Sequence, residues 1–446
     1  MKRLLHSRNG HRHRPVDFSP PKTAIPRLKG GNPAAELSQT PVLWKLALSK
    51  VLATAAPFAG MRPQIVLHAL GNLRAIMRAM MMGGLDPALT TFFVKKYNYP
   101  EKQQVLAWLR KRGFQVLPVE EITAGYLENL EAEVTLSGLP LFIVEDGGYF
   151  AAALHQYRPS LLSRVIGTVE QTSRGTAKLI EAVGGDLARI MIPVVSVPDS
   201  TLKKNFEPPF IADGILLSLT NLISRPMRQM KVLVLGYGVI GKALVERLVE
   251  AGADVTVYDP KLKHDPGSLY ARFEVARDPV MAAAGKDLII GASGRQSITP
   301  EVIDGASAGT YLASASSDQR EIAVDYLEEI AVEKEVLRHG FFYCEGGRER
   351  VPKGTTYRIL PDARELYLLH DGQPLNFLGF GGMEDREADL VLSLIFAGAV
   401  ELATGSYAGQ RGILAGAVDA VDEKYRIAET FVRFHRAPRP LSGESK

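Results

Sequence analysis

A glycine-rich turn is the first feature of this sequence whose residue types and spacing could do chemistry. The apolar run Val232 to Leu235 enters Gly236-x-Gly238-x-x-Gly241, and a helical pattern follows. In such a turn the first glycine permits a tight strand-to-helix connection, the second lets the backbone approach a pyrophosphate, and the third lets the helix pack against the strand. The positive N-terminus of the helix then faces the anion. The pattern predicts a dinucleotide site, the alternative being a strand-turn-helix that binds no ligand.

Residues around the turn indicate which dinucleotide it would bind. Asp259 ends a second apolar run, 23 residues after the first glycine. An acid in that place accepts hydrogen bonds from a ribose diol and repels a 2′-phosphate, so NAD is favoured over NADP. We expect the backbone at Val239 and Ile240 to contact this cofactor as well. Two later apolar runs, whose ends should point toward the same site, lead to Ser293 and Ser314.

Two clusters of ionisable residues precede the turn. Asp146 follows an apolar run and precedes two glycines, where it either faces a cleft or only shapes a turn. The segment PDSTLKKNFE follows another apolar run and carries Lys203 and Glu207. A solvated capping turn would explain the start of that segment as well as a reactive site would.

Hydroxyl groups and one histidine complete the set of candidate residues. GTVEQTSRG provides Thr172 and Ser173 before a helical pattern, which suits either the hydrogen bonding of sugar hydroxyls or the capping of a helix. His68 is a lone histidine at what we predict to be the start of an apolar helix, where it would more often be a core residue than a catalyst. The sequence contains no HExxH, Walker or GxSxG motif and no plausible set of metal ligands, so we predict no metal site.

The elements that would position these residues alternate along the chain. Short apolar runs alternate with helical patterns on both sides of the glycine turn, which is typical of parallel strands joined by crossover helices. We predict an α/β fold with two doubly wound parallel-sheet domains, the second a Rossmann NAD-binding domain. A long helix is expected from about residue 212 to 224, and a C-terminal helix is expected to return to the first domain. The predicted parts are a basic tail at 1–31, a substrate domain at 32–206, the NAD-binding domain at 207–383, the returning helix at 384–432 and a tail at 433–446.

Composition and charge limit the class of protein. With 446 residues, 46% of them hydrophobic, the chain can build two or three sizeable cores. The single cysteine, Cys344, excludes an internal disulfide and favours a reducing, cytoplasmic location. No apolar run reaches the length of a membrane span. The formal net charge is only +4, and the basic N-terminal segment is not accompanied by a recognisable nucleic-acid-binding motif. We therefore expect neither a membrane nor a nucleic-acid partner.

Taken in order, these clusters resemble those of the S-adenosylhomocysteine hydrolase family. The resemblance runs from about residue 68 to 402 and is carried by VLHAL, VEDGG, GTVEQTSRG, VPDSTLKKNF, GYGVIGK and LNFLG. It implies a tightly bound NAD that is reduced and re-oxidised within each cycle. A sugar hydroxyl is oxidised to a ketone, a neighbouring proton is removed, a thiol is expelled and water adds. Thr172 and Ser173 partly retain the hydroxyl run through which the family contacts NAD.

The resemblance also implies roles for single residues. Lys203 matches the family's lysine close to the oxidised hydroxyl, and Glu207 takes the place of the aspartate that follows it. His68 and Asp146 match the family's histidine and aspartate near the neighbouring carbon atoms. Because family members are commonly tetramers, we expect a homo-oligomer, either a dimer or a tetramer.

Several departures from the family's pattern point to a different substrate. The catalytic glutamate becomes Gln171, which cannot act as a carboxylate base, and an asparagine that meets the nicotinamide region becomes Pro208. Leu70 and Asn72 replace a threonine and an adenine-facing glutamate or glutamine, and two later histidines and the C-terminal tail have no match. The phosphate and ribose contacts of NAD are therefore kept, while most contacts to the substrate's adenosine are lost. We predict a nucleoside-like or sugar-like substrate other than ordinary S-adenosylhomocysteine.

Two other functions fit the sequence. An inactive homologue that binds NAD and regulates a partner is favoured by Gln171 and Pro208, and is opposed by the retained Lys203, His68 and Asp146. A net NAD-dependent dehydrogenase shares the general two-domain plan, but the arginine and histidine arrangement of 2-hydroxyacid dehydrogenases is not found here.

Overall fold

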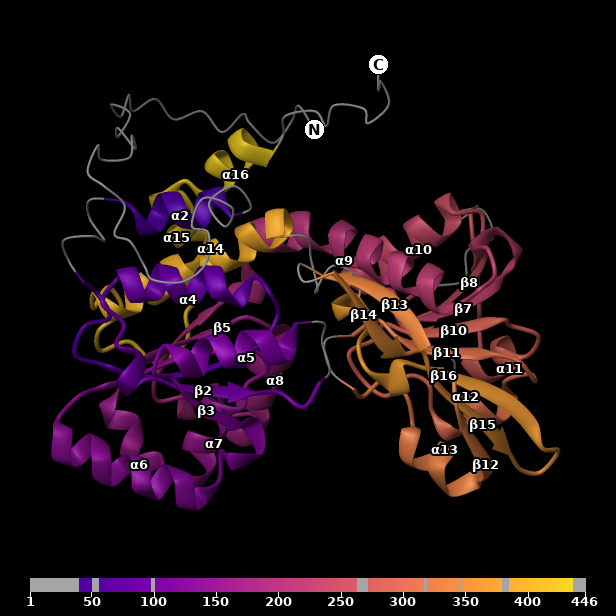
Figure 1. Cartoon of the computed structure of the whole chain (residues 1–446), viewed down its shortest axis with the longest axis horizontal. Coiled ribbons are helices and arrows are strands. Elements are labelled where there is room, and N and C mark those ends of the chain that lie inside the picture. Colours follow the sequence, from indigo (N-terminus) through magenta and orange to yellow (C-terminus); the bar gives the residue numbers. More distant parts are fainter. Residues whose placement is uncertain are drawn as a thin grey trace.

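The computed structural model describes residues 40–49, 56–97, 101–262, 272–316, 319–337, 339–344, 347–378 and 385–435. Two lobes lie side by side, and each is built on its own sheet (Figure 1). The basic tail predicted at 1–31 lies outside the described residues. Residues 436–446 of the tail predicted at 433–446 also lie outside them, whereas its first three residues close helix α16 (Ile427–His435).

A seven-stranded sheet forms the first lobe, in the order β17-β6-β5-β4-β1-β2-β3, and its described strand pairs are all parallel. Both faces of the sheet are buried, since Ile65 belongs to one apolar core and the adjacent Val66 to another. Near-continuous apolar strands are typical of such two-sided burial. The strands are β1 (Arg62–Leu67), β2 (Thr91–Val94), β3 (Gln115–Pro118), β4 (Leu141–Glu145), β5 (Val165–Glu170), β6 (Pro193–Ser196) and β17 (Gly412–Ile413).

Helices cover both faces of the first sheet (Figure 1). One core joins it to α2, α4, α5 and the late helices of the chain, and the other joins it to α6, α7 and α8. The helices are α2 (Pro41–Ala47), α4 (Leu73–Met82), α5 (Lys102–Lys111), α6 (Ala124–Ser137), α7 (Phe150–Tyr157) and α8 (Ser173–Ala182).

An eight-stranded sheet forms the second lobe, in the order β12-β15-β16-β11-β10-β7-β8-β9. The pairs from β16 to β9 are parallel, so the predicted doubly wound sheet is confirmed. β12 and β15 add antiparallel pairs at one edge, which the sequence patterns did not indicate. The strands are β7 (Lys231–Leu235), β8 (Asp254–Tyr258), β9 (Glu274–Val275), β10 (Leu288–Gly291), β11 (Tyr311–Ser314), β12 (Ala331–Val336), β15 (Gly354–Ile359) and β16 (Arg364–Leu369).

Helices again lie on both faces of the second sheet. One core joins it to α9 and α10, and the other to α11, α12 and α13. A separate hairpin, β13 with β14, completes the lobe. These elements are α9 (Thr201–Leu222), α10 (Val239–Glu250), α11 (Pro279–Ala283), α12 (Pro300–Gly305), α13 (Val324–Ile330), β13 (His339–Cys344) and β14 (Gly347–Pro352).

Helix α9 links the two lobes (Figure 1). Its first turn places Leu202 in the core of the first lobe, and its second half places Ile215 and Leu219 in the core of the second. The expected start at about residue 212 is wrong, because the Ser200 hydroxyl caps the helix by accepting a hydrogen bond from the Lys203 amide at 3.2 Å. The helix then continues through two prolines that interrupt the sequence pattern. The domain boundary predicted at 206/207 falls inside this helix.

The chain returns to the first lobe through α14 (Asp385–Ala403), as predicted. Apolar residues of α14 belong to the same core as α2 and α4. The buried carboxylate of Asp389 accepts hydrogen bonds at 2.9 Å from the amides of Val42 and Leu43, and so ties the returning helix to the start of α2. The range 384–432 also holds α15 (Ala417–Tyr425) and most of α16.

The segment before His68 is a strand, so the predicted helical start there is wrong. Pro63, Ile65 and Val66 lie in β1, between β2 and β4. β-Branched residues suit a strand that is buried on both faces. The helical pattern is correct only from Leu73, where α4 begins. His68 therefore follows the carboxyl end of a central strand.

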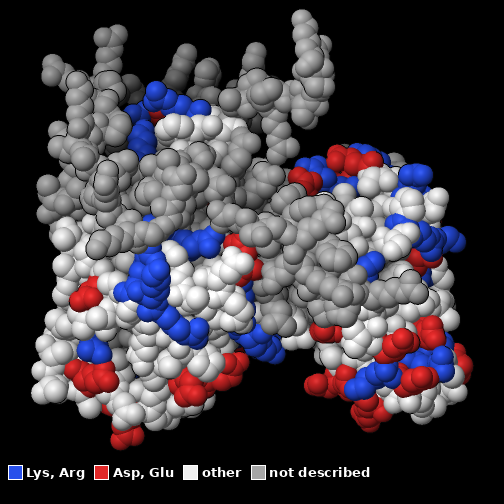
Figure 2. Space-filling model, in the orientation of Figure 1, with Lys and Arg blue, Asp and Glu red and all other residues white. Residues whose placement is uncertain are grey.

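Charged side chains of both signs share the surface seen in Figure 2. At the far end of the second lobe, Arg358 pairs with Glu333 at 2.6 Å and Glu365 at 3.1 Å, and Lys334 pairs with Glu328. Among the described helices, none has the length and apolar character that crossing a membrane requires. The described residues also contain no group of three or more metal-ligating side chains.

Candidate active site

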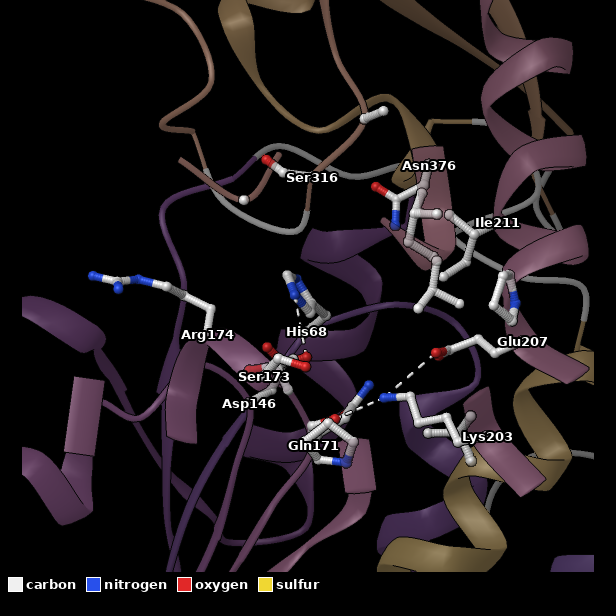
Figure 3. Close-up of a pocket in the computed structure, with 18 of the residues that line it drawn as sticks. His68, Asp146, Gln171, Ser173, Arg174, Lys203, Glu207, Ile211, Ser316 and Asn376 are labelled. Atoms are coloured by element: carbon white, nitrogen blue, oxygen red, sulfur yellow. Dashed lines mark hydrogen bonds and ion pairs between the residues drawn. The ribbon is translucent and has the colours of Figure 1, made fainter. Parts of the chain in front are cut away.

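A cavity of about 430 Å³ lies between the two lobes. The first lobe lines it with residues that follow β1, β4 and β5, and the second with residues that follow β7, β10 and β11. Ligands of parallel sheets bind beyond the carboxyl ends of the strands, which meet here from both sides. In Figure 3, His68, Asp146 and Lys203 lie on the side of the first lobe, and Ser316 and Asn376 lie opposite them.

The glycine turn predicted from the sequence borders this cavity. A Cβ on Gly241 would lie 2.1 Å from the carbonyl oxygen of Gly236, and a Cβ on Gly236 would lie 2.7 Å from the backbone of Ala292. Both glycines are therefore required by packing. A Cβ on Gly238 would meet nothing within 4 Å, and Gly238 lines the cavity together with the first residues of α10. The open space at the helix N-terminus fits the phosphates of a dinucleotide.

Asp259 follows β8, at the same edge of the sheet as the glycine turn. Its carboxylate accepts hydrogen bonds from the amides of Tyr237 at 2.7 Å and Lys261 at 2.8 Å. These bonds fix the carboxylate beside the turn. Each carboxylate oxygen keeps a second lone-pair direction, with which it can accept from a ribose hydroxyl.

The predicted hydroxyl contacts divide into two groups. Thr172, Ser173 and Ser293 line the cavity, as do the predicted turn residues Val239 and Ile240. Ser314 does not line it, because its side chain is fully buried and its hydroxyl meets that of Ser316 at 3.2 Å.

Two cavity residues were not singled out from the sequence. Ser316 lines the cavity two residues beyond Ser314. Asn376 is buried and lines the cavity, and within the described residues its side-chain oxygen has no hydrogen-bond partner. Buried polar atoms are rarely left unsatisfied. A ligand that brings an N–H group, as a carboxamide does, would satisfy this oxygen.

Lys203 occupies the first turn of α9, where Ser200 caps the helix. Its ammonium donates a hydrogen bond to the carbonyl oxygen of Gln171 at 2.7 Å and lies 3.5 Å from Glu207 Oε2, one helical turn later (Figure 3). Burial raises the pKa of Glu207, and the charge of Lys203 opposes that rise. The pair therefore presents a cation and a basic carboxylate to one point of the cavity.

His68 and Asp146 lie together after the neighbouring strands β1 and β4. Nε2 of His68 is 3.3 Å from Asp146 Oδ2, and both side chains are at least 95% buried. Lys95, which follows β2, joins them: its ammonium lies 2.5 Å from Asp146 Oδ1 and 3.1 Å from His68 Nε2. Burial alone would raise the pKa of Asp146, but the charge of Lys95 holds it well below its usual range. Nothing in the sequence pattern singled out Lys95.

A buried glutamate holds these first-lobe loops in place. The Glu170 carboxylate accepts hydrogen bonds from the amides of Gly147 at 3.0 Å, Gly148 at 2.9 Å and Thr172 at 2.7 Å, and from the Thr172 hydroxyl at 2.8 Å. Burial and the neighbouring carboxylates of Glu145 and Asp146 raise its pKa to about 8. Through these contacts Glu170 fixes the loop of Asp146 against the loop of Thr172.

The wall of the cavity formed by α4 and α14 is mostly apolar. Leu70 and Leu73 line it from the start of α4, and Val391 and Leu392 line it from α14. Asn72 is the polar residue of this wall, and its side chain does not cap α4. This surface suits an apolar or weakly polar group of a ligand better than a group with many hydrogen-bonding atoms.

Comparisons with known proteins agree with this arrangement. The family model described as "Putative NAD(P)-binding" matches residues 223–324. The chain is 27% identical over 344 residues to S-inosyl-L-homocysteine hydrolase of Methanopyrus kandleri, a match that covers 76% of this chain and 75% of that one. It is 27% identical over 391 residues to adenosylhomocysteinase of Aeropyrum pernix, covering 86% and 85% of the two chains. With the enzyme of the same name from Thermotoga maritima, the identity is 30% over 283 residues, covering 61% and 63%.

Proposed function

We propose that this chain, a divergent member of the S-adenosylhomocysteine hydrolase family, is an NAD-dependent enzyme that transiently oxidises a secondary alcohol of a sugar-like or nucleoside-like substrate. Oxidation at one carbon would permit elimination or addition at its neighbour. The observation that carries the proposal is one cavity lined by two different reactive pairs. Lys203 and Glu207 form one pair, and His68 and Asp146 form the other.

NAD would bind with its phosphates at Gly238 and the N-terminus of α10. Asp259 would accept hydrogen bonds from the adenosine ribose and repel a 2′-phosphate, which favours NAD over NADP. The buried oxygen of Asn376 would accept a hydrogen bond from the carboxamide of the nicotinamide. Bound NAD supplies the hydride acceptor, and later the hydride donor, for the carbon that carries the alcohol.

Lys203 and Glu207 would handle the alcohol proton. A carboxylate whose pKa is raised by burial is a better base than an exposed one, so Glu207 can accept the proton of the hydroxyl. The Lys203 ammonium, held in place by the Gln171 carbonyl, stabilises the negative charge that develops on the oxygen. Both groups come from one turn of α9, so their spacing is set by the helix.

His68 and Asp146 would act at the neighbouring carbon. A proton next to a ketone is acidic enough for a side chain to remove, and the group that leaves needs a proton in return. His68 lies in the cavity wall, with its Nε2 atom next to Asp146 and Lys95, and this buried cluster holds the ring in place.

The substrate would differ from ordinary S-adenosylhomocysteine at its base. Leu70, Leu73, Val391 and Leu392 supply apolar surface where adenine would need hydrogen-bond partners, and Asn72 offers one amide. A site that hydrogen-bonds a base can prefer it over its analogues by several orders of magnitude, and a site that lacks such partners loses this preference. We propose that residues 32–206 with the returning helix bind the substrate, that residues 207–383 bind NAD, and that the protein forms a homo-oligomer.

Absorbance of the reduced nicotinamide tests the redox step. Purified protein loaded with NAD is mixed with a panel of nucleosides and sugar alcohols, and the wild type should form reduced cofactor with at least one. Lys203→Met should lose this signal. Lys204→Met is the matched control: Lys204 borders the cavity, but its ammonium turns to Asp199 at the surface, 3.1 Å from the carbonyl oxygen, and the signal should be retained.

The outcome separates this proposal from its alternatives. If Lys203→Met reduces NAD as well as the wild type does, the assigned role of Lys203 is wrong. An inactive regulatory homologue, which the presence of Gln171 and Pro208 favours, would bind NAD but reduce none with any compound. A net dehydrogenase would consume added NAD in proportion to product, whereas the proposed cycle runs with the bound cofactor alone.

A further inference from the structure

Lys95 makes the His68–Asp146 pair into a three-membered buried cluster. Its side chain is 3% exposed, and its ammonium contacts both partners, at 2.5 Å from Asp146 Oδ1 and 3.1 Å from His68 Nε2. The three residues follow the adjacent strands β2, β1 and β4, whose parallel pairing brings their ends together. The cluster therefore depends on the sheet and not on local sequence.

The contact between Lys95 and His68 decides where the imidazole proton lies. A lysine ammonium has three donors and no lone pair, so a hydrogen bond with Nε2 requires that Nε2 accept. The proton of a neutral histidine is then on Nδ1. An imidazolium would place an Nε2–H group and a second positive charge 3.1 Å from the ammonium, which is unfavourable in a buried site.

We infer that Lys95 is a positioning residue that keeps His68 neutral, with its lone pair at Nε2 and its proton at Nδ1. Without Lys95, the Asp146 carboxylate 3.3 Å from Nε2 would favour the opposite state, an imidazolium that donates to Oδ2. The Lys95 cation thus reverses the protonation state that His68 would have beside the Asp146 carboxylate alone. In the reaction, His68 enters as a neutral imidazole, and this consequence rests on the proposed function.

Lys95 and Asp146 are charged groups in direct contact with His68. The ring of Tyr97 stacks on the imidazole with centroids 5.9 Å apart. Lys203 and Glu207 line the same cavity from α9 and form a pair of opposite charge. Within the described residues, the titratable and charged groups around His68 include Lys95 after β2, Tyr97 in the following loop, Asp146 after β4, and Lys203 and Glu207 on α9.

Nitrogen NMR of the histidine side chains tests this inference without any turnover. The chain has nine histidines, so a sample labelled with ¹⁵N-histidine gives few signals, and His68→Gln assigns the one of interest. In the wild type, Nε2 of His68 should have the shift of an unprotonated nitrogen and Nδ1 that of a protonated one, with no protonation of the ring between pH 6 and 8. A protonated Nε2 in this range overturns the inference.

Lys95→Met removes the charge and keeps a side chain of similar length. In this variant the midpoint of the His68 titration should rise by about two pH units, since a carboxylate without its cation favours the imidazolium. An unchanged midpoint refutes the role given to Lys95. If the variant does not fold, the ¹⁵N chemical shifts of His68 in the wild type still test the inference.

Lys178→Met is the matched control. Lys178 carries the same charge and lies 3.7 Å from the ring centroid of Tyr149, a ring that Lys95 approaches at 5.7 Å. The His68 titration should be unchanged in this variant, and an equal shift would show that contact with His68 is not the cause. Because the NMR readout needs no substrate, it can succeed where the proposed reaction fails. A failed substrate panel would therefore overturn only the proposed function.

Discussion

Two glycines of the cofactor turn should respond in opposite ways to the same added methyl group. On Gly241 the new Cβ would lie 2.1 Å from the Gly236 carbonyl oxygen, which is a backbone atom of the turn. The turn is also tight on its other side, since a Cβ on Gly236 would lie 2.7 Å from the Ala292 backbone. On Gly238 the new Cβ would touch no protein atom within 4 Å and would stand in the cavity. Gly241→Ala should therefore damage the fold, and Gly238→Ala should damage NAD binding.

The expected sizes follow from these distances. Overpacking of this kind costs about 1–3 kcal/mol, so Gly241→Ala should lower the melting temperature of the NAD-free protein by roughly 2–10 °C. Gly238 is the N-cap of α10 and its φ of −70° is open to alanine, so Gly238→Ala should cost at most about 1 kcal/mol.

Thermal unfolding with and without NAD measures both effects. At a hundredfold excess over the dissociation constant, NAD should stabilise the wild type by about 2.7 kcal/mol, which is roughly 5–10 °C for the NAD-binding lobe. If the methyl group of Gly238→Ala weakens binding about a hundredfold, the remaining stabilisation is only about 0.4 kcal/mol. A full NAD-induced shift in Gly238→Ala would mean that the pyrophosphate does not approach the turn. An unchanged melting temperature in Gly241→Ala would refute the packing argument.

Three further predictions concern single ionisable residues. Asp259→Ala should change the ratio of NAD to NADP affinities at least about tenfold toward NADP, measured by calorimetry, because it removes a ribose acceptor and the repulsion of a 2′-phosphate. Glu207→Gln should lower kcat by about 10²–10⁴-fold with little change in KM, and an unchanged kcat would exclude Glu207 as the base. Burial lowers the pKa of His370 from 6.5 to about 4, so the unfolded chain binds a proton that the folded chain does not, and stability should fall by up to about 3 kcal/mol as the pH drops from 6.5 to 4. Hydrogen exchange of β16 should report this loss, and His370→Gln should flatten it.

The cofactor side of the site was predictable because its signals are local. Gly236, Gly238 and Gly241 lie within six residues, and the strand, helix and acid around them follow in sequence order. Each glycine of the motif is explained by the space around it within one turn, and this turn lies at the cavity. Lys203 and Glu207 are also neighbours on one helix, although the two prolines that follow hid the start of that helix.

Lys95 could not be predicted because its environment is set by strand order. In the segment TTFFVKKY it reads as an ordinary lysine after a short strand, and its neighbour Lys96 is exposed. Lys95 is buried only because β1 lies between β2 and β4, which brings together residues 27 and 51 positions apart along the chain. His68 was misplaced for a similar reason: the apolar pattern across VLHAL suits a helix and a buried strand equally well.

The antiparallel edge of the second sheet could not be predicted, because an exposed strand has no distinctive hydrophobic pattern. β12 has the sequence AVEKEV and is exposed along most of its length, so no alternation of apolar and polar residues marks it as a strand. Its partner β15 is identified by pairing with β16, which joins the parallel sheet beside β11. Charged residues on such an edge are also what discourages pairing with another chain.

The division of the cavity between the lobes explains how a relative could keep its redox step and change its substrate. Most groups assigned to NAD, such as Gly238 and Asn376, lie on the second lobe, with Thr172 and Ser173 on the first. The apolar wall with Leu70 and Val391 belongs to the first lobe and the returning helix. Substitutions on that wall leave the packing of the glycine turn untouched, because no contact that fixes the turn comes from it. Lys203 lies on the helix that joins the lobes. Under the proposed function, the carbon to be oxidised would therefore keep its position next to the cofactor when the apolar wall changes. If the protein has the proposed function, replacing Leu70 or Asn72 should therefore change which compounds reduce NAD and leave the affinity for NAD unchanged.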